Sequence, residues 1–115
     1  MSRVFDHQEL LERIDNDWDF LAETIQMLST DGPVLIKEIR GGIGSGDAAA
    51  VGRAAHSLKG MVSNFCSPAT LASAFEVEKL GKSGDLSSAP QAVKVLEDQV
   101  GLLTAELNKF LDTRI

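Results

Sequence analysis

The residues of this chain best suited to chemistry lie together at positions 53–60, in the stretch R-A-A-H-S-L-K-G. Histidine can act as a nucleophile near neutral pH, because much of its imidazole is unprotonated there. If the stretch is helical, Lys59 and Gly60 share the face of His56, since they follow it by three and four residues. A nearby ammonium group can stabilise a phosphoryl group, which carries about −1.5 to −2 charge. The pattern is typical of a phosphoryl carrier.

The helix around His56 is predicted by its apolar residues, which recur at spacings of four and three and form one stripe: Val51, Ala55, Leu58, Val62 and Phe65. His56 falls away from this stripe, so we expect an exposed ring with Gly52, Gly60 and Ser63 near it on the helix surface. A glycine inside a helix costs about 1 kcal/mol relative to alanine. Two glycines here therefore need a reason, and we expect Gly60 to leave room for a partner or a phosphoryl group to reach the ring nitrogen.

Two other interpretations of the histidine remain open. A lone histidine in a small domain is more often a surface or hydrogen-bonded polar residue, although the glycines and Lys59 weigh against that here. A metal site is less favoured, because the chain has only two histidines and Arg53 stands where a Glu-x-x-His pair would place its glutamate. The single Cys66 cannot form a zinc cluster. We therefore expect no metal ligands.

The stretch R-A-A-H-S-L-K-G resembles the signature of histidine-containing phosphotransfer (HPt) domains, the modules of multistep phosphorelays. Weaker similarities extend upstream from Asp17 to Asp47 and downstream from Asn64 to Leu86. The resemblance implies that His56 exchanges a phosphoryl group with aspartates on receiver domains of response regulators or hybrid histidine kinases. It also implies that Mg²⁺ sits on the receiver, so that this chain binds no cofactor of its own.

The chain departs from the HPt pattern in two places. Met61-Val62 follows Gly60 where the family commonly has small residues, and Cys66-Ser67 stands where a Gly-Ala pair opens the next helix. We interpret Cys66-Ser67 as altered packing. Met61 either fills the core, which is the favoured interpretation, or widens an apolar rim for partner docking. Leu11 and Ile14 on the first helix are likewise open between docking and core packing.

One carboxylate interrupts an apolar stripe on the helix that follows. Leu71, Phe75, Glu78 and Lys82 share a face of that helix. If the face meets the His56 helix, Glu78 accepts a hydrogen bond from one ring nitrogen and leaves the other free to attack phosphorus. Lys82, at a position that is basic in the family, would assist with charge. For both residues an ordinary solvated helix end is an equally open interpretation.

Composition and charge limit the class of protein. At 115 residues with 43% hydrophobic content, we expect one domain over residues 1–115. The net charge of −6, without a cluster of basic residues, argues against nucleic acid, although Lys59, Lys79 and Lys82 predict a locally positive site. No apolar run reaches the roughly 18 residues of a membrane span, and the first six residues contain no apolar run after Arg3, so we expect no secretion signal. We therefore expect a cytoplasmic protein, and one cysteine is compatible with a reducing compartment. We also expect a monomer.

Helix patterns follow one another along the chain, at about residues 6–14, 18–28, 33–45, 47–65, 67–81 and 88–110. The last three are expected to begin with N-caps at Asp47, at Ser67 and at Ser88 or Ser87. Pro33 either begins a new helix or kinks one long helix that starts after an Asp17 cap. No strand alternation competes with these patterns. The predicted fold is all-α: an antiparallel up-and-down four-helix bundle, with the additional short N-terminal helix packed across one end.

The sequence thus predicts a phosphorelay phosphotransfer protein that carries a phosphoryl group on His56. No G-x-x-x-x-G-K phosphate loop occurs, so we expect neither ATP binding nor kinase activity. The alternative is an adaptor, a helical bundle that binds a signalling partner without being phosphorylated. An adaptor would not need Gly60 and Lys59 beside an exposed histidine.

Overall fold

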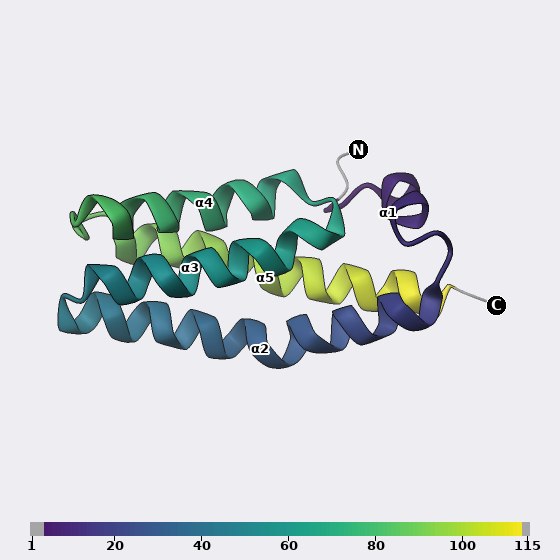
Figure 1. The fold of residues 1–115 in the computed structure, drawn as a ribbon, viewed down its shortest axis with the longest axis horizontal. Helices are drawn as coiled ribbons and strands as arrows, with labels where there is room; N and C mark the ends of the chain where they lie inside the picture. The colour runs from purple at the N-terminus through teal and green to yellow at the C-terminus, as the bar shows by residue number, and fades with distance from the viewer. Residues whose placement is uncertain (1–3, 114–115) are drawn as a thin grey trace.

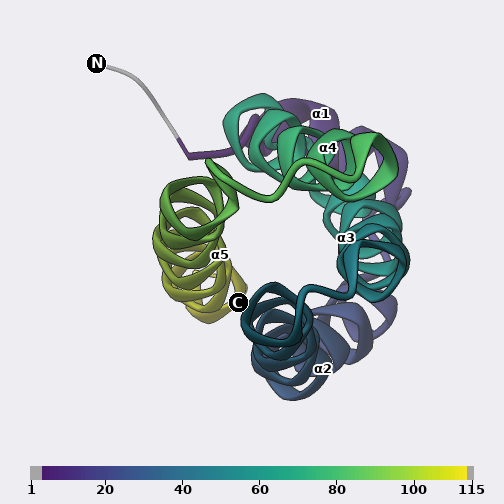
Figure 2. The same cartoon turned by 90° about the vertical axis from the view of Figure 1, so that its left-hand side faces the viewer.

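The computed structural model describes residues 4–113, and within that range the chain is helical and contains no strand. The elements are α1 (His7–Arg13), α2 (Trp18–Ser45), α3 (Ala48–Val62), the 3-10 helix η1 (Ser63–Phe65), α4 (Pro68–Ser83) and α5 (Ala89–Asp112). Helices α2 to α5 run up and down along the long axis, and α1 lies at one end (Figure 1). Seen along that axis, they form a ring in which α5 packs against α2 (Figure 2). The predicted bundle with its short extra helix is confirmed.

Aspartates start three of the helices. The side chains of Asp6, Asp17 and Asp47 each accept a hydrogen bond at 3.0 Å from a backbone N–H in the first turn. Such a cap satisfies one of the amides that a helix leaves without an intrahelical partner. The predicted caps at Asp17 and Asp47 are confirmed, and Asp47 begins the helix that carries His56.

Helix α2 continues through Pro33, so the structure selects the single long helix from the two predicted possibilities. It ends at Ser45 because Gly46 adopts a left-handed conformation, with φ of 74°. Gly42 stays inside the helix, where a Cβ would come within 2.8 Å of a Val51 methyl group. This glycine therefore allows α2 and α3 to approach each other closely.

The bundle core consists of the faces that the apolar spacing predicts. All five residues of the stripe on α3 and η1 are buried. The buried face of α5 repeats at spacings of three and four: Val93, Leu96, Val100, Leu103, Leu107 and Phe110. None of the helices within residues 4–113 combines the length and apolarity needed to cross a membrane.

The end of α4 and the starts of α4 and α5 differ from the prediction. Helix α4 ends at Ser83 rather than near Gly81, because Gly84 supplies the left-handed residue with φ of 79°. Ser67 and Ser88 occupy the positions before α4 and α5, but neither side chain caps its helix. The Ser67 hydroxyl instead donates a hydrogen bond to the Val4 carbonyl at 2.6 Å, which ties the N-terminal segment to the start of α4.

Helix α1 is attached across the connection between α3 and α4. The Asp6 backbone N–H donates to the Cys66 carbonyl at 2.9 Å, and the Arg13 guanidinium donates to the Ser63 carbonyl at 2.7 Å. Phe5 and Leu10 enter the core from this side. These contacts place α1 beyond the last turn of α3.

Candidate functional site

Four of the residues singled out in the sequence meet where α3 and α4 face each other. The Glu78 side chain is 1% exposed and lies between three nitrogen-bearing side chains. Its Oε2 lies 2.7 Å from His56 Nδ1 and 3.2 Å from Lys82 Nζ. Its Oε1 lies 2.6 Å from Lys59 Nζ. The structure therefore brings together the predicted nucleophile, the predicted carboxylate and both lysines, which we call the Glu78 cluster.

Two glycines explain why the carboxylate reaches the histidine. Gly52 lies one turn before His56, and Gly81 lies three residues after Glu78. A Cβ on Gly81 would overlap the backbone nitrogen of Gly52 and lie 3.0 Å from the Ala48 carbonyl. The two helix backbones therefore cross closely beside the Glu78 cluster.

This close crossing corrects one expectation. Gly52 is buried against α4, where it contributes backbone to the wall of a hollow beside the histidine and is not an exposed neighbour of the ring. Gly60 is exposed, and a Cβ there would meet nothing within 4 Å, while its role in the approach of a partner stays a prediction. Of the two glycines near His56, one serves helix packing and the other leaves open space on the exposed face of α3.

The Glu78 carboxylate is charged near neutral pH although it is buried. The hydrogen bond from Lys59 lowers its pKa most, those from His56 and Lys82 lower it further, and burial acts in the opposite direction. The result is a pKa of about 2, against an ordinary value of 4.5. The Glu78 cluster thus holds a stable anion beneath the imidazole.

A charged carboxylate determines which ring nitrogen is free. Ionised Glu78 can only accept hydrogen bonds, so the contact at Nδ1 requires the proton to lie on that nitrogen. In the neutral ring, Nε2 then carries the lone pair. The His56 side chain is 68% exposed, so this lone pair is open to an incoming phosphorus atom.

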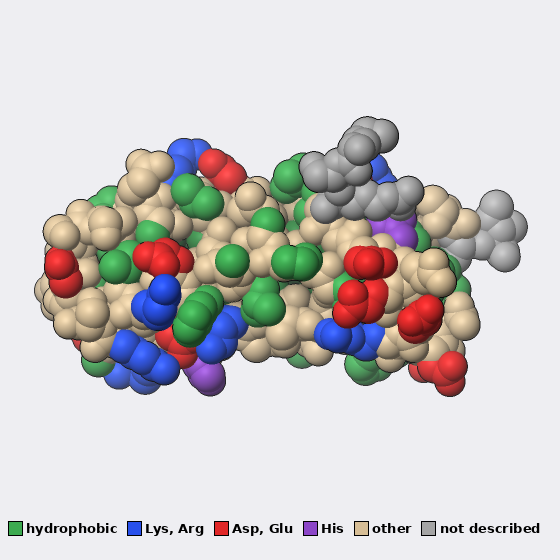
Figure 3. Space-filling view, turned by 90° about the horizontal axis from the view of Figure 1, so that it is seen from above, with side chains coloured by type: hydrophobic (Ala, Val, Ile, Leu, Met, Phe, Trp, Pro, Cys, Tyr) green, Lys and Arg blue, Asp and Glu red, His purple; other side chains and the backbone are tan. Residues whose placement is uncertain are grey.

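Hollows lie on both sides of the Glu78 cluster. One, of about 510 Å³, is lined by His56, Arg53 and Lys82 among small residues of α3 and α4. The other, of about 520 Å³, is lined by Lys59, Gly60 and apolar residues that include Phe75. We call them the His56 hollow and the Phe75 hollow. Figure 3, which looks onto α4, shows basic and hydrophobic side chains gathered together over this part of the bundle.

Sequence reasoning gave no functional role to Phe75 or Arg53. Phe75 is 48% exposed, and the Nζ atoms of Lys59 and Lys79 each lie 5.1 Å from its ring centroid. The helical spacing placed Phe75 on the face of Glu78, but an apolar residue on such a face is more often part of a core. Only the tertiary structure shows that it remains at the surface.

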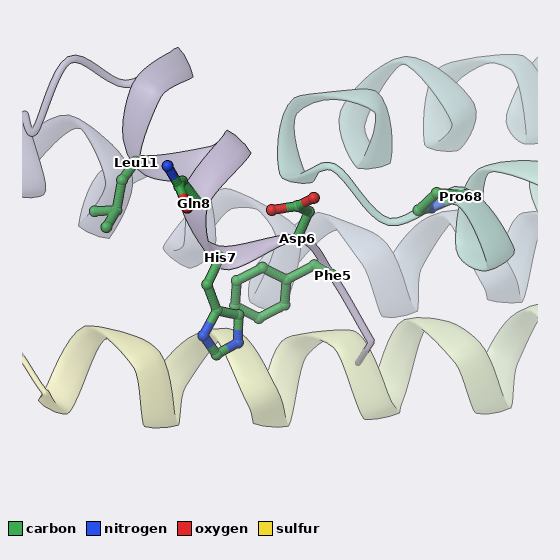
Figure 4. A pocket seen from close by; sticks show the side chains of 6 residues that line it. All are labelled: Phe5, Asp6, His7, Gln8, Leu11 and Pro68. Atoms are coloured by element: carbon green, nitrogen blue, oxygen red, sulfur yellow. The ribbon is translucent and has the colours of Figure 1, made fainter. Parts of the chain in front are cut away.

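The other predicted residues lie outside the Glu78 cluster. The Ser63 hydroxyl donates to the Gly60 carbonyl at 2.6 Å rather than to His56. Ile14 is buried in the core, so its proposed docking role is corrected. Met61 is partly buried against the core. Leu11, also partly buried, lines a third hollow of about 860 Å³ beside α1, where Phe5 and His7 lie side by side (Figure 4).

Comparisons with known proteins agree on the family. A family model described as the Hpt domain matches residues 23–109. No curated protein matches the chain. Among solved structures, the chain is similar to the crystal structure of histidine-containing phosphotransfer protein B (HptB) from Pseudomonas aeruginosa PAO1, with 19% sequence identity and a TM-score of 0.88. The match covers 100% of both chains and shows a shared fold.

Proposed function

The chain belongs to the Hpt domain family, and on that premise we propose that it carries a phosphoryl group on His56 between receiver-domain aspartates of response regulators or hybrid histidine kinases. The observation that supports this most directly is the 2.7 Å contact between His56 Nδ1 and buried Glu78. It leaves an exposed ring nitrogen with its lone pair directed outward.

The transfer step uses this geometry. The Nε2 lone pair of His56 attacks the phosphorus of an aspartyl phosphate, the N–P bond forms, and the P–O bond to the aspartate breaks. The aspartate leaves as a carboxylate, and the Nδ1 proton stays on the ring. The phosphorylated ring is therefore cationic, and ionised Glu78 stabilises it across the hydrogen bond. Return of the phosphoryl group to a second receiver reverses these bond changes.

Positioning and charge neutralisation account for most of the catalysis in phosphoryl transfer. Glu78 fixes the tautomer and the orientation of the ring, so it is a positioning residue. Lys59 and Lys82 together outweigh the single carboxylate, which leaves the Glu78 cluster positive in an acidic protein. This local charge favours approach of a negatively charged phosphoryl group.

The remaining features of the proposal concern what the partner supplies. The Mg²⁺ that such a transfer uses would belong to the receiver, and the chain itself would bind no ATP and act as a carrier. We propose a monomer in the cytoplasm, where receivers of signalling kinases are found and where Cys66 would remain reduced.

The receiver would dock over the Phe75 hollow. Lys59 and Gly60 belong both to the surroundings of His56 and to the lining of this hollow, so a protein that reaches the histidine also covers it. Leu71 and Phe75 offer exposed apolar surface there, with Lys59 and Lys79 over the ring. An apolar residue flanked by acidic side chains, such as those around a receiver's phosphorylated aspartate, fits this combination.

The decisive experiment incubates the protein with a radiolabelled phospho-receiver domain, beside His56→Gln and a His7→Gln control. We expect label on the wild type and on the control, none on His56→Gln, and loss of the label in acid but not in base. If His56→Gln is labelled equally, the site is wrong. A folded protein that binds receivers but takes no label from any of them would instead indicate the adaptor.

A further inference from the structure

Arg53 is the basic residue near the histidine that the proposed function leaves unused. It lies on α3, three residues before His56, and residues at this spacing are neighbours on a helix surface. Arg53 is exposed, and it lines the His56 hollow together with His56 and Lys82. Arg53 therefore lies on the side of α3 that carries His56, next to the same hollow.

Three basic side chains lie around His56, those of Lys59, Lys82 and Arg53, and they differ in the contacts that they already make. Lys59 Nζ lies 2.6 Å from Glu78 Oε1 and over the Phe75 ring, and Lys59 does not line the His56 hollow. Lys82 is 71% exposed and lies farther from the carboxylate, at 3.2 Å. The side chain of Arg53 makes no hydrogen bond or ion pair with any residue in the described range 4–113. The guanidinium of Arg53 thus has no partner among the described residues, and the ammonium group of Lys82 has only its 3.2 Å contact with Glu78.

Arg53 and Lys82 supply positive charge to the lining of the His56 hollow, beside the Ser57 hydroxyl and the Glu78 carboxylate that His56, Lys59 and Lys82 already contact. Ala48, Ala49, Gly52 and Gly81 contribute only methyl groups and backbone. At Gly52 and Gly81 the two helix backbones meet without side chains between them. A guanidinium binds phosphate oxygens through two parallel hydrogen bonds, whereas an ammonium acts as a point charge.

We propose that Arg53 and Lys82 form the phosphoryl-binding cradle of this protein, on opposite sides of the groove between α3 and α4, while Lys59 serves to hold Glu78. The inference rests on the proposed function, because the anion in the cradle is the phosphoryl group on Nε2 of His56. Arg53 would hold two of its oxygens and Lys82 a third. No bond changes at either residue.

The test labels His56 with phosphoramidate, a small donor that needs no docking surface and releases ammonia as the N–P bond forms on the ring. Arg53→Gln, Arg53→Lys, Lys82→Gln and Lys59→Gln are compared with Arg40→Gln, whose arginine pairs with Glu97 on another face. A charge-assisted hydrogen bond is worth about 1.5–3 kcal/mol, so we expect labelling of Arg53→Gln to slow by about tenfold or more. Arg53→Lys should recover part of the rate, and Arg40→Gln should match the wild type.

A second readout reports contact with the phosphoryl group directly. A cation held against the phosphoryl oxygens lowers their pKa, which ³¹P NMR measures as a titration of the phosphohistidine signal. We expect this pKa to rise by about one pH unit in Arg53→Gln and in Lys82→Gln, and to stay at the wild-type value in Arg40→Gln. A merely structural role of Arg53 would not move it.

The outcomes separate this inference from the function on which it rests. If neither phosphoramidate nor a phospho-receiver labels the wild type at His56, the proposed function fails. If His56 is labelled but the ³¹P titration changes only in Lys59→Gln, the cradle is overturned and Lys59 holds the phosphoryl group. If the pKa of the phosphohistidine signal rises in Arg53→Gln and Lys82→Gln but keeps the wild-type value in Lys59→Gln, the result supports the cradle.

Discussion

Two carboxylates bridge neighbouring helices in this bundle, and each lies 2.6 Å from a cation. Glu97 of α5 pairs with Arg40 of α2 at the surface, where the two side chains are 48% and 45% exposed. Glu78 of α4 pairs with Lys59 of α3, and its side chain is 1% exposed. An exposed pair contributes about 0–1 kcal/mol, whereas loss of one partner from a buried pair costs about 3–5 kcal/mol. Burial, rather than distance, distinguishes the candidate site from an ordinary surface contact.

The helix crossings beside the two pairs differ in the same way. Where α3 meets α4, Gly52 and Gly81 bring the backbones together and fix the carboxylate beneath the histidine. On α5, Gly101 has no atom within 4 Å of the position of a Cβ. Gly81 therefore has a role in helix packing near Glu78, whereas Gly101 has none.

The largest effect is expected from Gly81→Ala, compared with Gly101→Ala. The added methyl group on Gly81 overlaps the Gly52 backbone and forces α3 and α4 apart, which should lower the free energy of unfolding by about 3 kcal/mol. Gly101→Ala should be neutral or stabilise by up to about 1 kcal/mol. Urea unfolding followed by circular dichroism measures both. If the two variants were equally stable, the helices would tolerate a methyl group at position 81, and the expected clash with Gly52 would be contradicted.

The next largest effect concerns the rate at which His56 takes up a phosphoryl group when either carboxylate is neutralised. Glu78→Gln keeps the size of the side chain but removes the charge that stabilises the phosphorylated ring, so phosphoramidate labelling of His56 should slow by about tenfold. Glu97→Gln should label at the wild-type rate and lose less than about 1 kcal/mol of stability. A Glu78→Gln protein that labels normally would reduce Glu78 to a structural residue.

Acid titration sharpens the same comparison. The pKa of Glu78 is about 2 in the folded protein, against an ordinary value of 4.5, so the unfolded chain takes up its proton first as the pH falls. The stabilisation is complete above pH 4.5 and is lost as the pH falls toward 2. Unfolding measured from pH 7 to pH 3 should therefore show a steeper loss of stability in the wild type and Glu97→Gln than in Glu78→Gln. Parallel curves for all three proteins would contradict the lowered pKa.

The smallest effect is expected at the proposed docking surface. Phe75→Ala removes exposed apolar surface beside Gly60, and Phe20→Ala removes a similarly exposed ring, 53% exposed, from α2. We expect the KM for a phospho-receiver to rise by about fivefold in Phe75→Ala only, since truncating an interface side chain typically costs about 1 kcal/mol. Labelling by phosphoramidate should stay unchanged in both. A rise in Phe20→Ala alone would move docking to α2.

Local patterns in the sequence predicted most of the fold. The aspartate caps and the apolar spacing on α3 and α5 are properties of short segments, and the structure shows them as expected. Pro33 was ambiguous because a proline can begin a helix or lie within one. The choice depends on packing between α2 and α5, where Gly32 lies against Val100.

The candidate site was predictable only in part. Helical spacing predicted a contact between Glu78 and His56 if their two helix faces meet, and the structure contains this contact. The roles of the two residues in phosphoryl transfer stay a prediction. The burial of Ile14 and the position of Gly52 against Gly81 depend on which helices become neighbours. No local pattern in α3 contains that information. The same holds for the exposure of Phe75 on α4.

The imidazole is oriented before any partner arrives, because the hydrogen bond from Nδ1 to Glu78 lies entirely within this chain. A preorganised nucleophile presents the same geometry to every receiver, and by microscopic reversibility donation and acceptance pass through the same arrangement. Under the proposed function, the protein would therefore impose no direction on the relay. Net flow would follow the concentrations of phosphorylated and unphosphorylated receivers together with the phosphoryl-transfer free energy of each receiver, as mass action requires.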